Sequence, residues 1–248
     1  MENYELNLCH LYPDLLNVYG DYGNILILKY RCEQRGIKTN LVNVGINDNF
    51  DYKNMDITLI GGGQDFEENI VSSDLFQKKK DIKNYVEDMG VLIGICGGYQ
   101  LLGDYYVTST GDKVVGLKLI PVYTEKGDKR IINDIIIEDL VTKEKYVGFE
   151  NHGGRTFLKE GCKPLGKVLY GTGNNGEDGY EGCVYKNTLG TYLHGSLLAK
   201  NEKLCDNLIK RAVKRKYKVD IELEELDSNL EKMARKVILD RCKVKNEE

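Results

Sequence analysis

The chain has 248 residues, of which 41% are hydrophobic and 30% are charged, and its formal net charge is −4. A chain of this length can bury a full core in one domain. Its slightly negative net charge gives no indication of nucleic-acid binding. The mean hydropathy is −0.42, no apolar run approaches membrane-spanning length, and the N-terminus lacks a signal-peptide pattern. We therefore expect a soluble, cytoplasmic protein that does not insert into a membrane.

The first half of the chain alternates short apolar runs with helical patterns. Strand, helix and strand in repetition are typical of a parallel sheet with right-handed crossovers. We predict strands at 6–12, 39–44, 56–60 and 91–95, and helices at 24–35 and 75–89.

The second half differs in composition. Residues 114–193 are rich in β-branched residues and tyrosine, which favours several antiparallel strands extending one edge of the sheet. Two helices, at 200–217 and 222–243, are predicted to close the chain. The fold class is thus α/β, with a mostly parallel sheet flanked by helices and antiparallel strands added in the second half. We place one domain at 1–220 and a C-terminal helical extension at 221–248.

The seven cysteines are scattered, and none belongs to a Cys-x-x-Cys pair. A zinc site or a disulfide framework is therefore not expected, and most of these residues suit small buried hydrophobic positions. We expect Cys32 and Cys205 in helices and Cys183 in a strand.

Cys96 has a different local setting. It follows the apolar run 91–95, and the spacing Gly94-x-Cys96-x-Gly98 is that of a nucleophile elbow with sulfur in place of a serine hydroxyl. A thiol at the first turn of a helix is biased toward thiolate by the helix dipole. These features predict that Cys96 is a reactive nucleophile.

A cysteine hydrolase also needs a base. Of the three histidines, His10 lies in the first strand pattern and His152 lies in the segment 148–155. His194 is the strongest candidate because it follows an apolar strand, and open α/β sheets place ligands at the carboxyl ends of strands. By itself, His194 would more simply be a strand-end histidine bonded to backbone; beside a cysteine elbow the catalytic interpretation is favoured.

The run Gly61-Gly62-Gly63 follows another predicted strand end. Its backbone N–H groups can approach a ligand closely, and with the N–H of Gly97 they can hold a developing oxyanion. A plain turn is the alternative, although three consecutive glycines carry an entropic cost. We predict Gly62, Gly63 and Gly97 as oxyanion-hole donors. The chain has no Gly-x-x-x-x-Gly-Lys-Ser/Thr loop for ATP.

Taken in order, the blocks at 11–24, 61–65, 94–103 and 192–195 resemble class I (triad) glutamine amidotransferases of the CobB/CobQ-like group. The blocks 11–24 and 148–156 narrow the resemblance to GatD-type glutaminase subunits of lipid II isoglutaminyl synthases. The resemblance covers residues 6 to about 211. It implies a flavodoxin-like fold and a heterodimer with a Mur-ligase-like (MurT-like) synthetase subunit.

The resemblance also implies roles for individual residues. Cys96 would attack the side-chain amide of L-glutamine, and His194 would activate it and later protonate the ammonia. Gln100, one helical turn after the cysteine, would help to hold the substrate. Arg130 would pair with the α-carboxylate, which a planar guanidinium can bind bidentately.

One position departs from the family pattern. Many class I glutaminases carry a glutamate two residues after the histidine, and this chain has Ser196 there. A serine hydroxyl carries no charge to stabilise an imidazolium. The resemblance implies that the synthetase partner supplies the missing acid, so our hypothesis is a triad completed in trans.

The implied product is ammonia, passed to a partner that amidates the D-glutamate of the lipid II stem peptide in peptidoglycan biosynthesis. ATP and Mg²⁺ are expected on that partner, with no cofactor or metal in this chain. The resemblance also implies that the acceptor is a membrane-bound, lipid-linked precursor. The basic segment 210–216 and the C-terminal helix are candidates for the partner contact.

Three alternatives stay open. The first is another amide acceptor, such as a corrinoid acid; the cobyric acid synthases usually carry a fused ATP-binding domain for which this chain has no space. The second is a PfpI-type peptidase or DJ-1-like protein, in which a histidine commonly follows the cysteine where this chain has Gly97. The third is a non-enzymatic binding protein on the same fold, against which the intact Cys96 and His194 argue.

Overall fold

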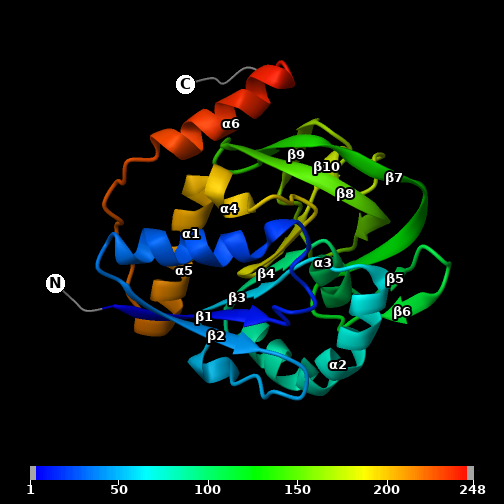
Figure 1. The fold of residues 1–248 in the computed structure, drawn as a ribbon, viewed down its shortest axis with the longest axis horizontal. Coiled ribbons are helices and arrows are strands. Elements are labelled where there is room, and N and C mark those ends of the chain that lie inside the picture. Colours follow the sequence, from blue (N-terminus) through cyan, green and yellow to red (C-terminus); the bar gives the residue numbers. More distant parts are fainter. Residues whose placement is uncertain (1–3, 245–248) are drawn as a thin grey trace.

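A six-stranded sheet forms the centre of the computed structural model, which describes residues 4–244 (Figure 1). Residues 1–3 and 245–248, at the outer ends of the predicted domain and extension, lie outside this description. The strand order is β11-β12-β4-β3-β1-β2, and all but β11 run parallel, as the alternating pattern predicts. The strands are β1 (Glu5–Leu11), β2 (Lys38–Val44), β3 (Ile57–Ile60), β4 (Val91–Ile95), β11 (Cys183–Tyr185) and β12 (Thr188–Thr191).

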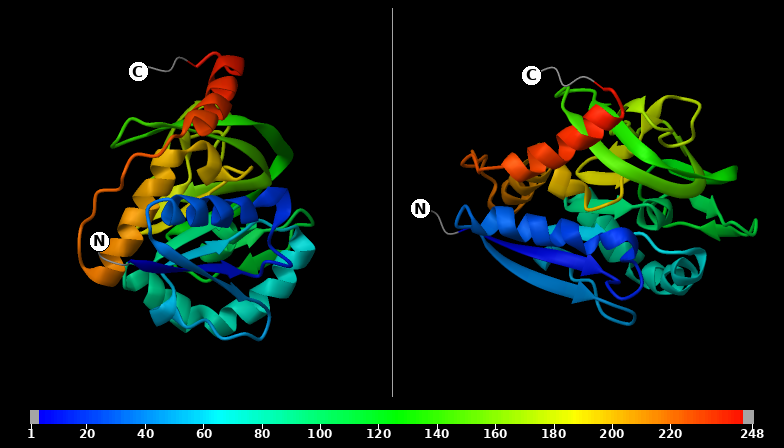
Figure 2. Two further views of the ribbon diagram at one scale, coloured as in Figure 1. Left: turned by 60° about the vertical axis from the view of Figure 1, so that its left-hand side comes forward. Right: turned by 45° about the horizontal axis from the view of Figure 1, so that its top comes forward.

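Helices cover both faces of this sheet (Figures 1 and 2). Successive strand residues alternate between the two cores: Leu59 packs with the α1 and α5 side, whereas Ile60 packs with the α2 and α3 side. The flanking helices are α1 (Tyr22–Glu33), α2 (Asp65–Glu87), α3 (Gly97–Leu102) and α5 (Glu202–Tyr217), with the short turns η1 (Val18–Gly20), η2 (Tyr52–Asn54) and α4 (Leu197–Lys200) between elements.

The second half builds a separate sheet, which corrects the expectation that its strands extend the first one. Its order is β10-β9-β7-β5-β6, with β8 paired to β7. The two long strands, β7 and β8, pair antiparallel with each other along most of their length. They therefore form a sheet of their own and do not extend an edge of the first one. The bridge between Phe149 and His194 joins the two sheets. The strands are β5 (Tyr105–Val107), β6 (Lys113–Val115), β7 (Val122–Asp139), β8 (Lys145–Leu158), β9 (Gly166–Tyr170) and β10 (Tyr180–Glu181).

Two helix boundaries differ from the prediction. Helix α2 begins at Asp65, ten residues before the predicted start at 75, because Gln64 and Glu67 form a capping box. The last helix, α6 (Asn229–Arg241), begins seven residues after the predicted start at 222. Residues 222–227 include like charges three apart, which disfavour a helix, and the carbonyl of Glu224 accepts a hydrogen bond from Arg35 on α1.

Helix α6 lies across α4 and β8 at the top of Figure 1. It buries Ile238 and Leu239 in a small core with Ile136 and Val147 of the second sheet. A salt bridge of 2.9 Å joins Arg235 to Glu202, and the C-terminal extension is thereby fixed to the rest of the fold.

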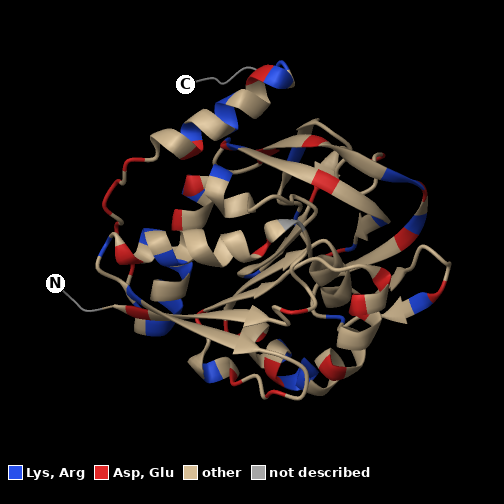
Figure 3. Ribbon diagram, viewed as in Figure 1, with Lys and Arg blue, Asp and Glu red and all other residues tan. Residues whose placement is uncertain are grey.

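The basic segment 210–216 of α5 is balanced by acidic groups of the same chain. Lys210 pairs with Glu222, Arg215 with Asp88, and Lys216 with Asp56. Figure 3 shows the same interspersion of Lys and Arg with Asp and Glu across the ribbon. The segment therefore does not form a uniformly basic surface.

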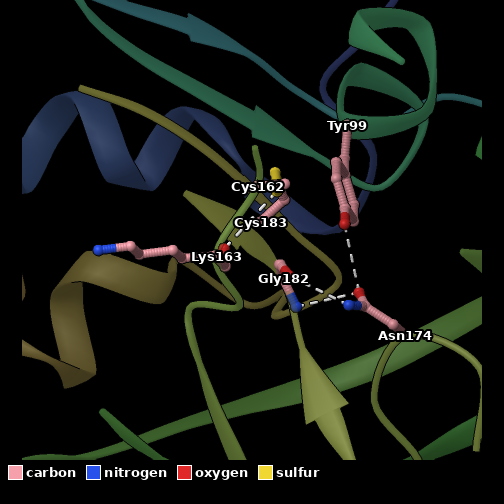
Figure 4. The surroundings of a disulfide bond; sticks show 6 residues. All are labelled: Tyr99, Cys162, Lys163, Asn174, Gly182 and Cys183. Carbon is pink, nitrogen blue, oxygen red and sulfur yellow. Dashed lines mark hydrogen bonds between the residues drawn. A yellow bond between two sulfur atoms is a disulfide. The ribbon is translucent and has the colours of Figure 1, made fainter. Parts of the chain in front are cut away.

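Cys162 and Cys183 are joined by a disulfide, contrary to the expectation that no cysteine is bridged. A bridge between Lys163 and Val184 brings the two segments together, a proximity that spacing in the sequence does not reveal. Figure 4 shows the disulfide near the hydrogen bonds by which Asn174 links Tyr99 to Gly182. As predicted, Cys32 and Cys205 lie in helices and Cys183 lies in a strand.

No helix among the described residues combines the length and apolar character needed to cross a bilayer.

Candidate active site

Four neighbouring parallel strands deliver the candidate residues to one edge of the first sheet. Asp21, Gly62, Cys96 and His194 follow β1, β3, β4 and β12, and these strands are adjacent in the order β12-β4-β3-β1. The carboxyl ends of parallel strands share an edge, so residues far apart in the sequence converge there.

Cys96 sits in a strained turn between β4 and α3. Its φ and ψ are 51° and −106°, and its N–H donates to the carbonyl of Thr191 at 2.9 Å. A Cβ at Gly98 would lie 2.4 Å from the carbonyl oxygen of Ile60, so only glycine allows this close approach. Strain and packing together fix the half-buried thiol in the geometry of a nucleophile elbow.

His194 lies beside Cys96. A Cβ placed on Gly62 would be 3.2 Å from both the Cβ of Cys96 and the Cε1 of His194, so both side chains lie next to Gly62. Phe149 holds the His194 backbone through an N–H to carbonyl bond of 2.8 Å. Burial disfavours the imidazolium, but the negative charges of Cys96 and Asp21 outweigh it and raise the pKa of His194 to about 10. The site therefore favours a protonated imidazole beside Cys96.

A carboxylate of the same chain lies next to that histidine. The Oδ1 of Asp21 is 3.8 Å from the Nδ1 of His194, and both side chains are fully buried. The other oxygen, Oδ2, accepts the N–H of Gly62 at 2.7 Å. Catalytic hydrogen bonds are often long in ligand-free structures. Asp21 thus has the position and charge of an orienting acid.

Ser196, two residues after the histidine, supports this arrangement. Its hydroxyl donates to the carbonyl of Gly20 at 2.9 Å, and a Cβ at Gly23 would lie 2.1 Å from the same hydroxyl oxygen. Ser196 therefore packs against the turn that carries Asp21. Asp21 is not among the site residues predicted from the sequence. It is nevertheless an acidic residue between Gly20 and Gly23, in the segment after the first predicted strand.

The glycine loop differs in part from the predicted oxyanion hole. The N–H of Gly62 is already donated to Asp21, so it is not available to a substrate oxygen in this structure. The N–H groups of Gly63 and Gly97 are the remaining donors of the predicted set.

A cavity of about 670 Å³ opens in front of Cys96 and holds both predicted substrate-binding residues. The Nε of Arg130 donates to the Oδ1 of Asn151 at 2.5 Å, which orients the guanidinium. The Nε2 of Gln100 donates to the hydroxyl of Tyr192 at 3.0 Å. The cavity thus combines a thiol, a cation for a carboxylate and an amide.

His152 also lines the cavity, and it is neutral. Burial lowers its pKa to about 3, and its Nδ1 is 2.9 Å from the carbonyl of Gly154, so that nitrogen carries the proton. The ring stacks on Tyr192 with the centroids 3.7 Å apart. His10 instead stacks on Tyr22, away from the cavity lining. His194 is accordingly the histidine paired with the thiol.

Within residues 4–244, no cluster of three or more His, Cys, Asp or Glu side chains has the arrangement of a metal site.

The chain is similar to known proteins of one family. The model of the CobB/CobQ-like glutamine amidotransferase domain matches residues 7–202. The chain belongs to this family. The family match spans every strand of both sheets except the start of β1, together with the elbow and His194.

Relatives in two bacteria are similar over most of their length. The chain is 48% identical over 221 residues to the lipid II isoglutaminyl synthase (glutamine-hydrolyzing) subunit GatD of Streptococcus pneumoniae, covering 89% of this chain and 85% of that relative. It is 42% identical to the subunit of the same name in Staphylococcus aureus, covering 96% and 97%. Cobyric acid synthase of Listeria innocua is 32% identical, but the match covers only 34% of that protein.

Solved structures show the same fold. A glutamine amidotransferase superposes with a TM-score of 0.56 at 15% identity, covering 82% of this chain and 98% of the other. A second one, from Thermotoga maritima, has a TM-score of 0.54 at 15% identity, with 94% and 93% covered. The α/β architecture is thus that of glutamine amidotransferases.

Proposed function

We propose that this chain is the glutaminase subunit of a lipid II isoglutaminyl synthase. It hydrolyses L-glutamine to glutamate and ammonia and passes the ammonia to a Mur-ligase-like subunit, which uses ATP and Mg²⁺ to amidate the D-glutamate of the stem peptide. The observation that carries this proposal is Cys96, beside His194, in the lining of a cavity that also holds Arg130. Relatives named GatD, matched over most of their length, support the choice of acceptor.

The first half of the reaction forms a thioester. Arg130 binds the α-carboxylate, and the thiolate of Cys96 attacks the amide carbon of the side chain. The N–H groups of Gly63 and Gly97 hold the oxyanion. His194 donates its proton to the amide nitrogen, the carbon–nitrogen bond breaks, and ammonia leaves.

The second half releases glutamate. His194, now neutral, takes a proton from water, and the resulting hydroxide attacks the thioester carbon. The carbon–sulfur bond breaks, and the thiolate of Cys96 is restored. Asp21 keeps the imidazole oriented and stabilises its protonated form through both halves.

A corrinoid acid is the second candidate acceptor, because cobyric acid synthases are also relatives. The match spans about a third of those proteins but 85% and 97% of the two GatD relatives. Coverage therefore favours the stem peptide.

Ammonia release tests the proposal. The chain is incubated with glutamine, alone and with a Mur-ligase-like partner, and ammonia is measured. We expect Cys96→Ala to lower the rate by ~10³-fold or more, because nucleophilic catalysis is lost. Cys242→Ala, directly after the end of α6, is the matched control and should retain the rate. Ammonia release that survives Cys96→Ala would exclude Cys96 as the nucleophile.

The same assay tests the hypothesis of a triad completed in trans. The 3.8 Å separation between Asp21 and His194 leaves room for a partner to tighten the pair or add an acid. We expect the complex to release ammonia faster than the isolated chain. Equal rates would mean that the partner adds nothing to this site. Transfer is followed by mass spectrometry of the stem peptide with ATP present.

A further inference from the structure

One buried carboxyl group faces the cavity without a cation. Glu68, on α2, is 3% exposed and lines the same cavity as Cys96 and Arg130. Its Oε2 is buried and has no hydrogen-bond partner of normal geometry among the described residues. A buried carboxylate normally has a cationic or hydrogen-bonding partner, because desolvation makes an isolated charge costly.

The neighbours of Glu68 do not supply that partner. Burial, with smaller contributions from the acidic Asp65 and Glu67, raises its pKa to about 8, although the Tyr106 hydroxyl acts in the opposite direction. The hydroxyl of Tyr106 also lies beside the carboxyl but carries no charge. The charged neighbours of this cavity-lining carboxyl group therefore include no cation.

Glu68 lies immediately beside the reaction centre. A Cβ at Gly97 would lie 1.9 Å from the Oε1 of Glu68, so the carboxyl occupies the space next to the residue that follows the nucleophile. A negative charge at this place would repel an oxyanion held by Gly97 unless a cation neutralised it. The carboxyl group is therefore compatible with the oxyanion when it is protonated or when a positively charged group lies beside it.

We propose that Glu68 binds the α-ammonium group of glutamine. This inference rests on the proposed function and adds to it the residue that recognises the amino-acid end. Glu68 on α2 and Arg130 on β7 line the same cavity as Cys96. An acidic and a basic side chain are thus available to the ammonium and carboxylate groups that share the α-carbon of glutamine, and the thiol is available to the side-chain amide. On binding, the carboxyl proton of Glu68 passes to solvent, and the ammonium group replaces it as the partner.

The test compares glutamine with glutaramate, which keeps the amide and the carboxylate but lacks the α-ammonium group. For the complex with its partner, kcat/KM is measured for both substrates in the native protein and in Glu68→Gln. We expect Glu68→Gln to lower kcat/KM for glutamine by ~10²-fold, mainly through KM, because a charged hydrogen bond is lost. The value for glutaramate should change by less than ~3-fold.

The control is Asp81→Asn, which removes a carboxylate from the same helix away from the cavity and should leave both substrates unchanged. Equal losses for the two substrates in Glu68→Gln would overturn the inference, since Glu68 would then act on the amide or on the fold. A native complex that hydrolyses neither substrate would instead refute the proposed function.

A second measurement leaves Glu68 in place. Calorimetry of ligand binding to Cys96→Ala, in two buffers of different ionisation enthalpy at neutral pH, counts the protons released. Glutamine should release more protons than glutaramate, because only glutamine displaces the proton of Glu68. Equal release would contradict the inference even if Glu68→Gln failed to fold.

Discussion

Asp21 gives His194 a carboxylate from within its own chain, although the position two residues after the histidine holds Ser196. The acid arrives from the loop after β1 rather than from the histidine's own segment. A one-dimensional motif cannot show this, because the contact joins residues more than 170 positions apart. Cys96 and His194 could be found because glycine spacing and a strand end leave a local signal.

Replacement of Asp21 by asparagine should slow the reaction and change its pH dependence. Loss of the charge lowers the pKa of His194, which is about 10 in the native site. The alkaline limb of kcat/KM should therefore move to lower pH, and kcat should fall by ~10²-fold. Asp14→Asn, an exposed acid in the same loop, is the control. An unchanged limb in Asp21→Asn would show that this carboxylate does not act on the histidine.

The same pair makes a pH-dependent contribution to stability. The pKa of His194 is raised above its ordinary value of 6.5, so its protonated form is favoured in the folded protein. That contribution to the free energy of unfolding is fully present below about pH 6.5 and is lost as the pH rises through about 10.

The early start of helix α2 determines which of its residues line the cavity. The apolar pattern begins at residue 75, but the capping box at Gln64 starts the helix ten residues earlier. This first part of the helix carries Glu68 to the cavity. Its few apolar residues, Phe66, Ile70 and Val71, stand among polar and acidic ones, so the capping residues are the clearer sign of the helix start.

Helix α6 should be held by its buried side chains rather than by its outer face. Leu239 is 1% exposed and Val237 is 63% exposed. We expect Leu239→Ala to lower the free energy of unfolding by about 2–4 kcal/mol, because a cavity is left behind. Val237→Ala should change it by less than about 0.5 kcal/mol. Urea unfolding measures both values, and equal losses would contradict this packing of α6.

At the scale of the whole molecule, the parallel sheet could be predicted but its companion could not. Short apolar runs separated by helices specify strand order through handedness and short connections. Strands β7 and β8 pair with each other and not with a strand of the first sheet. The composition of residues 114–193 indicates strands but does not show which sheet they join. The disulfide between Cys162 and Cys183 is missed for the same reason.

In the proposed function, Cys96 acts on glutamine as a reactive thiol in a cavity that residues of both sheets line. The most direct measurement is labelling of the chain, alone and in its complex, with a glutamine-derived diazo ketone, followed by peptide mass spectrometry. We predict one adduct, on Cys96, that forms faster in the complex and is prevented by excess glutamine. An adduct on another cysteine, or labelling that glutamine does not slow, would contradict the account.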